Sequence, residues 1–205
     1  MLVGTEIESL CRTMIFPLLA SLLGFSAATD ASTAQASQWA INAKYFALTY
    51  HPDGGEHEGY PRKLDDAAYW VLQVGTQVEV DRRLASWLQL RGTVALYRDC
   101  ADVWAGYVHL GPRLEWTPLP QLSLRFGIGP TFLWRENWLF HVEGYAKDSF
   151  FGKADSTSDY QTAFLWYGGD LEAQWRFGPR WSVVGSMVPG WPEVVTTSLG
   201  VRREF

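Results

Sequence analysis

The stretch QLSLRFGIGPTFLW, residues 121–134, alternates between two kinds of side chain over its whole length. One row is apolar and consists of Leu122, Leu124, Phe126, Ile128, Pro130, Phe132 and Trp134. The other row mixes polar and small residues, and it consists of Gln121, Ser123, Arg125, Gly127, Gly129, Thr131 and Leu133. Because successive side chains of a strand point to opposite faces, this pattern indicates a strand with one face in an apolar medium. Glycines, hydroxyls and a charge on the other face do not make a packed soluble core.

The same division recurs at residues 70–80, 108–116 and 166–177. In the first of these, the row opposite the aliphatic one consists of Val71, Gln73, Gly75, Gln77 and Glu79. Strands that are apolar outside, polar inside and aromatic near their ends are typical of transmembrane β-barrels. A soluble sandwich or lipocalin-like barrel is the alternative, but it would place the charges outside and could not hide 11 Trp and 11 Phe. We therefore predict an all-β, antiparallel transmembrane barrel.

The pattern predicts eight strands, enough to close such a barrel without an exposed edge. They are expected at about 39–51, 68–80, 84–97, 103–116, 121–135, 162–177, 181–188 and 194–205. The short links at 81–83, 117–121 and 178–180 are predicted to be periplasmic turns, and the links at 52–67, 98–102, 136–161 and 189–193 to be external. This assignment places His51, Asp99, Cys100 and Arg135 at the outer rim. The terminal Phe205 closes the last strand, as in outer-membrane assembly signals.

The N-terminal segment reads as an export signal. An apolar stretch at 14–27 follows Arg12, and AQA at 34–36 has the form that a signal peptidase accepts. We predict a signal peptide over residues 1–36, with Met14 as an alternative start and a short membrane anchor as the alternative function. Residues 37–205 then form a single domain, whose lone cysteine is Cys100. In an oxidising compartment this residue is a bystander, a site of intermolecular pairing or a reactive thiol.

Two strand ends carry residues that suit proton transfer. His51 continues an inward row, and Asp99 continues the inward parity of Tyr97. The row before His51 consists of Tyr45, Ala47 and Thr49. An imidazole and a carboxylate that converge at a barrel mouth form a general-base pair, to which Cys100 adds a nucleophile. The alternative is an ordinary rim histidine and an aspartate that caps its own turn.

Other site types find less support. The four histidines have no metal-ligand spacing, so neither a metal nor another cofactor is expected, and the net charge of -5 argues against nucleic acid. The stretch WRENW at 134–138 is different, because Arg135 and Asn137 in it could hold a lipid phosphate. The alternative is that this stretch belongs to the aromatic girdle of the barrel and binds no ligand.

Several short motifs carry a resemblance to a known family. They are TYH at 49–51, RDC at 98–100, WTPL at 116–119, GIG at 127–129, RENW at 135–138, Gly178-Pro179, Pro189-Gly190 and the terminal Phe. In this order and spacing the chain resembles the lipid A palmitoyltransferase (PagP) family of eight-stranded outer-membrane barrels, over nearly the whole mature length. That family has Thr-Trp-His, Lys-Asp-Ser and Arg-Asp-Asn-Trp where this chain has TYH, RDC and RENW.

The resemblance implies a monomeric enzyme in the outer membrane of a Gram-negative cell. It would move an acyl chain, typically palmitoyl, from a phospholipid to lipid A without a cofactor. The implied catalytic residues are His51 and Asp99, with Cys100 at the position of the family's serine. The implied substrate-binding residues are Arg135, Asn137, Trp138, Gly127 and Gly129, the two glycines leaving room for an acyl chain in the upper barrel.

The chain departs from the family in three ways. A thiol replaces the serine hydroxyl, the amphipathic helix that precedes the first strand is missing, and the link at 136–161 is longer. Two other functions therefore stay open. One is a non-catalytic barrel that binds a ligand or partner through its external loops, and the other is a lipid A deacylase.

Overall fold

The computed structural model describes residues 38–52, 60–142, 151, 158–190 and 194–205. The predicted signal peptide, the alternative start and the middle parts of both long links lie outside the described residues. Eight strands are present in the described part: β1 (Trp39–Tyr50), β2 (Trp70–Ala85), β3 (Leu88–Arg98), β4 (Trp104–Leu119), β5 (Leu122–Glu136), β6 (Tyr160–Arg176), β7 (Trp181–Gly190) and β8 (Val194–Glu204). A 3-10 turn, η2 (Trp138–Phe140), follows β5.

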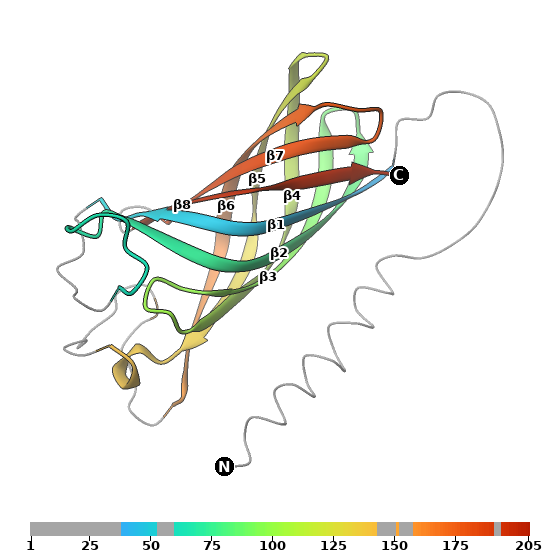
Figure 1. Cartoon of the computed structure of the whole chain (residues 1–205). Helices are drawn as coiled ribbons and strands as arrows, with labels where there is room; N and C mark the ends of the chain where they lie inside the picture. Colours follow the sequence, from blue (N-terminus) through green and yellow to red (C-terminus); the bar gives the residue numbers. More distant parts are fainter. Residues whose placement is uncertain (1–37, 53–59, 143–150, 152–157, 191–193) are drawn as a thin grey trace. The chain divides into compact units, whose positions relative to one another are not determined.

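Each strand pairs antiparallel with the next, and β8 pairs with β1 to close the barrel (Figure 1). The predicted fold class and the number of strands are therefore confirmed. Strand β5 shows the predicted alternation: the outward Phe126, Ile128 and Phe132 are 42–46% exposed, whereas the inward Arg125 is 2% exposed. No helix among the described residues is long and apolar enough to cross a membrane. An exterior of exposed aliphatic and aromatic side chains around a polar lumen suits lipid and is typical of a transmembrane β-barrel.

The predicted turn at 81–83 is wrong, because strand β2 continues through it to Ala85. Asp81, which the sequence analysis assigned to this turn, points into the lumen and is 1% exposed. Its Oδ1 lies 2.5 Å from Arg91 Nε, and it also pairs with Arg202. Ion pairs across the lumen thus satisfy charges that the sequence pattern assigns to solvent. The link predicted at 117–121 is also shorter in the structure, where β4 runs to Leu119 and β5 begins at Leu122.

Strand β1 contains a bulge that the sequence analysis missed. Its register against both β2 and β8 shifts between Lys44 and Phe46. Tyr45, predicted to point inward, is 58% exposed, whereas Lys44 is buried in the lumen. A bulge inserts one residue and resets the alternation. Even-numbered residues therefore point inward before it and odd-numbered ones after it, which turns His51 toward the lumen.

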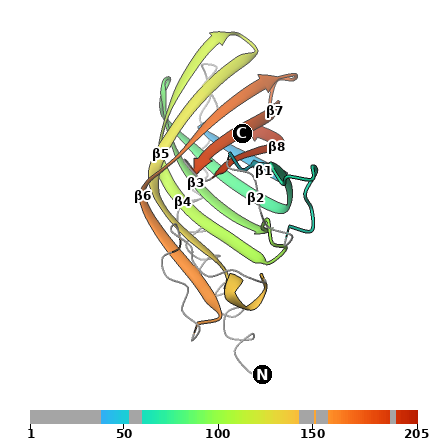
Figure 2. The same ribbon diagram turned by 90° about the vertical axis from the view of Figure 1, so that its left-hand side faces the viewer.

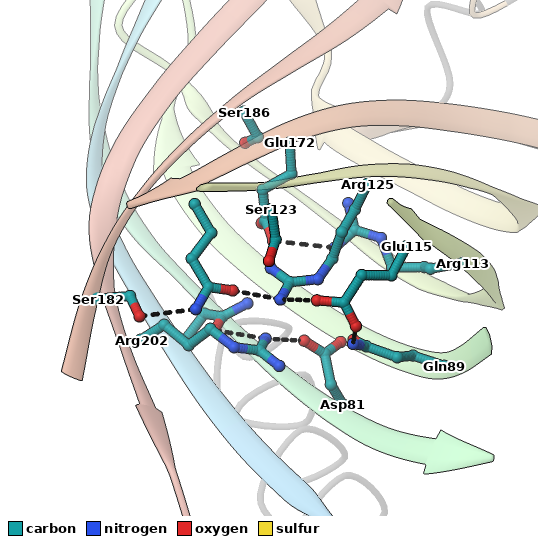
Figure 3. A network of polar contacts seen from close by, with 12 residues as sticks. Asp81, Gln89, Arg113, Glu115, Ser123, Arg125, Glu172, Ser182, Ser186 and Arg202 are labelled. Atoms are coloured by element: carbon teal, nitrogen blue, oxygen red, sulfur yellow. Dashed lines mark hydrogen bonds and ion pairs between the residues drawn. The ribbon is translucent and has the colours of Figure 1, made fainter. Parts of the chain in front are cut away.

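The periplasmic half of the lumen is filled by a buried ionic network (Figure 3). At its centre Glu172 lies 2.8 Å from Arg91, 3.0 Å from Lys44, 3.1 Å from Arg125 and 3.4 Å from Arg113. These side chains come from five strands and are at most 3% exposed. The network closes the periplasmic half of the lumen, and the outer half above it stays open.

The strands of the barrel wall are not all paired along their full length. Strands β6 and β7 are paired from Leu171 and Met187 to Arg176 and Ser182, which is their periplasmic part. In the described residues the outer part of β6 pairs with β5 alone, and it diverges from β7 (Figure 2). The hydrogen-bond ladder of the wall is thus interrupted near the outer rim.

Candidate functional site

The outer half of the lumen holds a cavity of about 500 Å³. Its floor is polar and is formed by Lys44, Glu79, His109 and Asp170 at the top of the ionic network. Its walls are mostly small or apolar residues: Ala47, Gly75, Ala95, Ala105, Leu133, Leu165, Gly168, Gly169 and Val188. Its mouth is formed by His51, Tyr60, Asp99, Cys100, Arg135 and Trp138. Ligand pockets usually range over about 300–1,000 Å³, so this cavity can accept an elongated apolar ligand with a polar head at the rim.

His51 and Cys100 meet at this mouth. Strand β1 ends at Tyr50, and the His51 amide donates to the carbonyl of Tyr69 at 2.8 Å, which fixes the chain where the strand stops. The His51 Nε2 atom lies 3.2 Å from Cys100 Sγ. The two strand ends singled out in the sequence therefore meet in space, and they form a base and a potential nucleophile in contact.

Gln73 is a member of this group that the sequence analysis did not select. It belongs to β2, and its Nε2 donates to Cys100 Sγ at 3.3 Å. The alternation of residues 70–80 predicts that the Gln73 side chain points inward. The pattern does not predict a role for Gln73, because glutamines are common in the lumen of a barrel. Nothing in the sequence indicates that this glutamine contacts the link between β3 and β4.

Asp99 lies at the same mouth but has a different partner from the expected one. Its Oδ2 accepts a hydrogen bond from Trp138 Nε1 at 2.7 Å, and its Oδ1 accepts from the amides of Ala101 at 2.9 Å and Val103 at 3.2 Å. None of these three bonds comes from His51. The expected orientation of His51 by Asp99 is therefore replaced by a structural role, in which the carboxylate holds the turn that carries Cys100.

Burial changes the acidity of both residues in this turn. Cys100 is 5% exposed, and removal from water raises the pKa of its thiol to about 12, against the smaller opposing effect of the Gln73 hydrogen bond. Burial likewise raises the pKa of Asp99, while the Trp138 hydrogen bond acts in the opposite direction. The thiol is protonated at neutral pH, so it needs a base at the moment of reaction.

The residues predicted to bind substrate divide into two groups. Arg135 and Trp138 line the cavity mouth, where the Arg135 guanidinium lies 3.9 Å from the centroid of the Trp138 ring. Asn137 is fully buried and instead caps η2 through Leu139 N, at 3.0 Å, and binds the Ser158 carbonyl at 2.8 Å. Asn137 thus positions Trp138 and does not line the cavity.

The two glycines expected to make room for an acyl chain do not line the cavity either. A Cβ atom on Gly127 would meet the side chains of Asp170 and Arg113, and one on Gly129 would meet the backbone of Leu110. These positions allow close packing in and around β5. The cavity walls instead include Gly75, Gly168 and Gly169. Among the described residues no group of three or more His, Cys, Asp or Glu is arranged to hold a metal ion.

Comparison with known proteins gives the architecture alone. No protein-family model matches the chain, and no curated protein matches it. Solved barrels with a similar fold include Neisserial surface protein A, at 12% identity and a TM-score of 0.49, covering 83% of this chain and 99% of that one. Others are Ail of Yersinia pestis in complex with the heparin analogue sucrose octasulfate (15% identity, TM-score 0.45, 82% and 98% covered) and the N-terminal β-barrel domain of Pseudomonas aeruginosa OprF (12%, 0.46, 83% and 100%). Likenesses at this level describe a barrel and carry no information about activity.

Proposed function

We propose that this protein is a phospholipid:lipid A acyltransferase of the outer membrane. The observation that carries the proposal is the His51–Cys100 pair, 3.2 Å apart, at the mouth of a cavity of about 500 Å³ with small and apolar walls. An acyl chain in the cavity would bring its ester carbonyl to the mouth. There a base can act on an attacking hydroxyl or thiol.

Two further features support a lipid substrate. Arg135 at the mouth offers a planar cation for a phosphate or carboxylate near the reacting ester. The β6–β7 ladder stops at Leu171 and Met187, and Gly169 and Pro189 beyond that point line the cavity. An acyl chain would enter the cavity from the membrane plane at this break. The resemblance in motif order to the lipid A palmitoyltransferases agrees with both features.

The test is mass spectrometry of lipid A from Gram-negative cells that lack such an enzyme and express this protein. We expect lipid A to gain the mass of one acyl chain, and His51→Ala to reduce this product at least about 100-fold, the lower range for loss of a general base. His141→Ala, which changes an exposed histidine, is the matched control and should retain the product.

The same spectrum separates the rival functions. Loss of one acyl chain from lipid A would indicate a deacylase. An unchanged spectrum with the wild-type protein folded in the membrane would leave a non-catalytic barrel and would end the proposal.

A further inference from the structure

We propose that acyl transfer proceeds through a thioester on Cys100, with His51 as the base and Gln73 as the donor to the oxyanion. This inference rests on the proposed function and names the mechanism of that site. It differs from direct transfer, in which His51 would deprotonate the acceptor hydroxyl and the thiol would only polarise the donor ester.

The geometry brings two side chains from separate parts of the barrel onto the sulfur atom of Cys100. His51 follows β1, Gln73 lies in β2, and Cys100 lies in the link after β3. The distances to Cys100 Sγ are 3.2 Å from His51 Nε2 and 3.3 Å from Gln73 Nε2. All three line the cavity. The thiol thus contacts a base and an amide donor at the same time. This arrangement suits nucleophilic attack by the sulfur on a carbonyl.

The first half of the reaction transfers the acyl group to sulfur. Cys100 Sγ attacks the ester carbonyl carbon of the phospholipid as His51 Nε2 takes the thiol proton. The carbonyl oxygen becomes an oxyanion next to sulfur, within reach of the Gln73 amide that now donates to Sγ. The C–O bond then breaks, His51 returns the proton to the leaving alkoxide, and a lysophospholipid departs. The products are a thioester and a neutral imidazole.

The second half regenerates the enzyme. The acceptor hydroxyl of lipid A enters the space left by the lysophospholipid and attacks the thioester carbonyl as His51 takes its proton. The C–S bond breaks, and the thiolate receives that proton from His51. Burial raises the pKa of the Cys100 thiol, which agrees with this order of events, in which His51 takes the proton as sulfur attacks.

Asp99 and Trp138 act as positioning residues in this scheme. Asp99 ties the turn 99–103 through two backbone amides, and Trp138 fixes the carboxylate from the other side. The sulfur is thereby held against His51 and Gln73, so a small displacement of the turn would separate the reacting groups.

The experiment uses purified full-length protein in detergent with a phospholipid whose acyl chain is isotopically labelled, and without any acceptor. We expect a burst of lysophospholipid equal to the amount of enzyme. Acid-quenched protein should carry one labelled acyl chain on the peptide containing Cys100, removable by neutral hydroxylamine. Addition of lipid A should discharge this chain onto the acceptor. His51→Ala, which keeps the cysteine, should show neither burst nor label.

Variants at the other two positions complete the test. Cys100→Ala should lose transfer, and Cys100→Ser should form a hydroxylamine-resistant ester more slowly. Gln73→Leu should lower the rate of the burst about 100-fold, as loss of one oxyanion donor does elsewhere, with little change in KM. Gln121→Leu makes the same exchange at an exposed periplasmic turn and should leave the burst intact.

The outcomes distinguish the two proposals. Transfer by Cys100→Ala at the wild-type rate, or wild-type transfer without burst and without label, would overturn the thioester and leave the acyltransferase standing. If the wild-type protein shows no label and no transfer, both proposals are overturned. A labelled Cys100 that passes its chain to water alone would keep the thioester and replace the transferase by a hydrolase.

Discussion

Trp138 Nε1 donates a 2.7 Å hydrogen bond to Asp99 Oδ2, joining residues that lie 39 positions apart in the chain. This bond connects η2, the turn that follows β5, to the link after β3, which carries Cys100. The carboxylate is 7% exposed, so its bonds to Trp138 and to the turn amides replace the water that it has lost. The mouth of the cavity is therefore held by a buried carboxylate, and its precision depends on Trp138.

Trp138→Phe should weaken the turn without emptying the mouth, because phenylalanine can still pack under Arg135. A hydrogen bond to a charged group is worth about 1.5–3 kcal/mol, so we expect the transfer rate to fall by at least tenfold while the barrel remains folded. The pKa of Asp99, already raised by burial, should rise further since the Trp138 N–H favours the ionised form. The acid limb of the pH–rate profile should therefore move to higher pH.

Trp104→Phe is the control for this change, because Trp104 is a 40% exposed rim indole whose replacement leaves the bonds of Asp99 intact. Equal losses in the two variants would show that the Asp99–Trp138 bond has no special part in transfer.

The buried thiol gives a prediction about chemical reactivity. With the pKa of Cys100 at about 12 instead of 9.0, its thiolate fraction near pH 8 falls about a thousandfold. Alkylation by iodoacetamide in the folded protein should be slower by a similar factor than in the same protein unfolded in urea. Its rate should still rise tenfold per pH unit from about pH 8.5 to pH 10.5. A folded-state rate that levels off near pH 9 would contradict the raised pKa.

The alternation of residues was sufficient to predict the barrel because lipid and lumen make opposite demands on neighbouring side chains. The stretch at 121–134 shows this directly, as every predicted outward residue from Leu124 to Phe132 is more exposed than its inward neighbours. The turn at 81–83 was harder to predict, because Asp81 carries a charge that solvent could satisfy as well as Arg202 does. Only the closed barrel shows that they satisfy one another.

The candidate site was predictable in its composition and not in its contacts. Strand parity and loop length brought His51, Asp99 and Cys100 to one rim, and the structure places all three at one cavity mouth. The alternation of residues gives no sign of the bulge at Tyr45. His51 was therefore assigned inward from a row that begins with Tyr45, although the Tyr45 side chain points outward. The partners of Asp99 depend on how η2 folds back over the mouth, which is a tertiary arrangement that no local pattern records.

The cavity walls give a prediction about substrate length. Ala95 of β3 is 5% exposed and lines the cavity, so Ala95→Leu should place a branched side chain in space that an acyl chain would occupy. We expect transfer of the longest chains to fall at least tenfold, and shorter chains to be transferred in their place. Mass spectrometry of lipid A measures both effects at once. Ala173→Leu makes the same exchange on the outward face of β6 and should not change the product. If long chains are still transferred by Ala95→Leu at the wild-type rate, the acyl chain does not lie in this cavity.

The ionic network gives the last prediction, which concerns stability. Glu172 is 3% exposed and lies within 3.4 Å of four cationic side chains, so Glu172→Gln keeps the shape but leaves those charges short of a counter-ion. Breaking a buried ion pair typically costs about 3–5 kcal/mol, and the free energy of unfolding should fall by about that much. Urea unfolding in lipid vesicles, followed by tryptophan fluorescence, measures the change. Arg176→Gln breaks a 3.8 Å pair with Glu204 in which the arginine is 41% exposed, and it should cost less than about 1 kcal/mol. Equal urea midpoints of unfolding for the two variants would mean that the network fills the lumen without stabilising the folded protein.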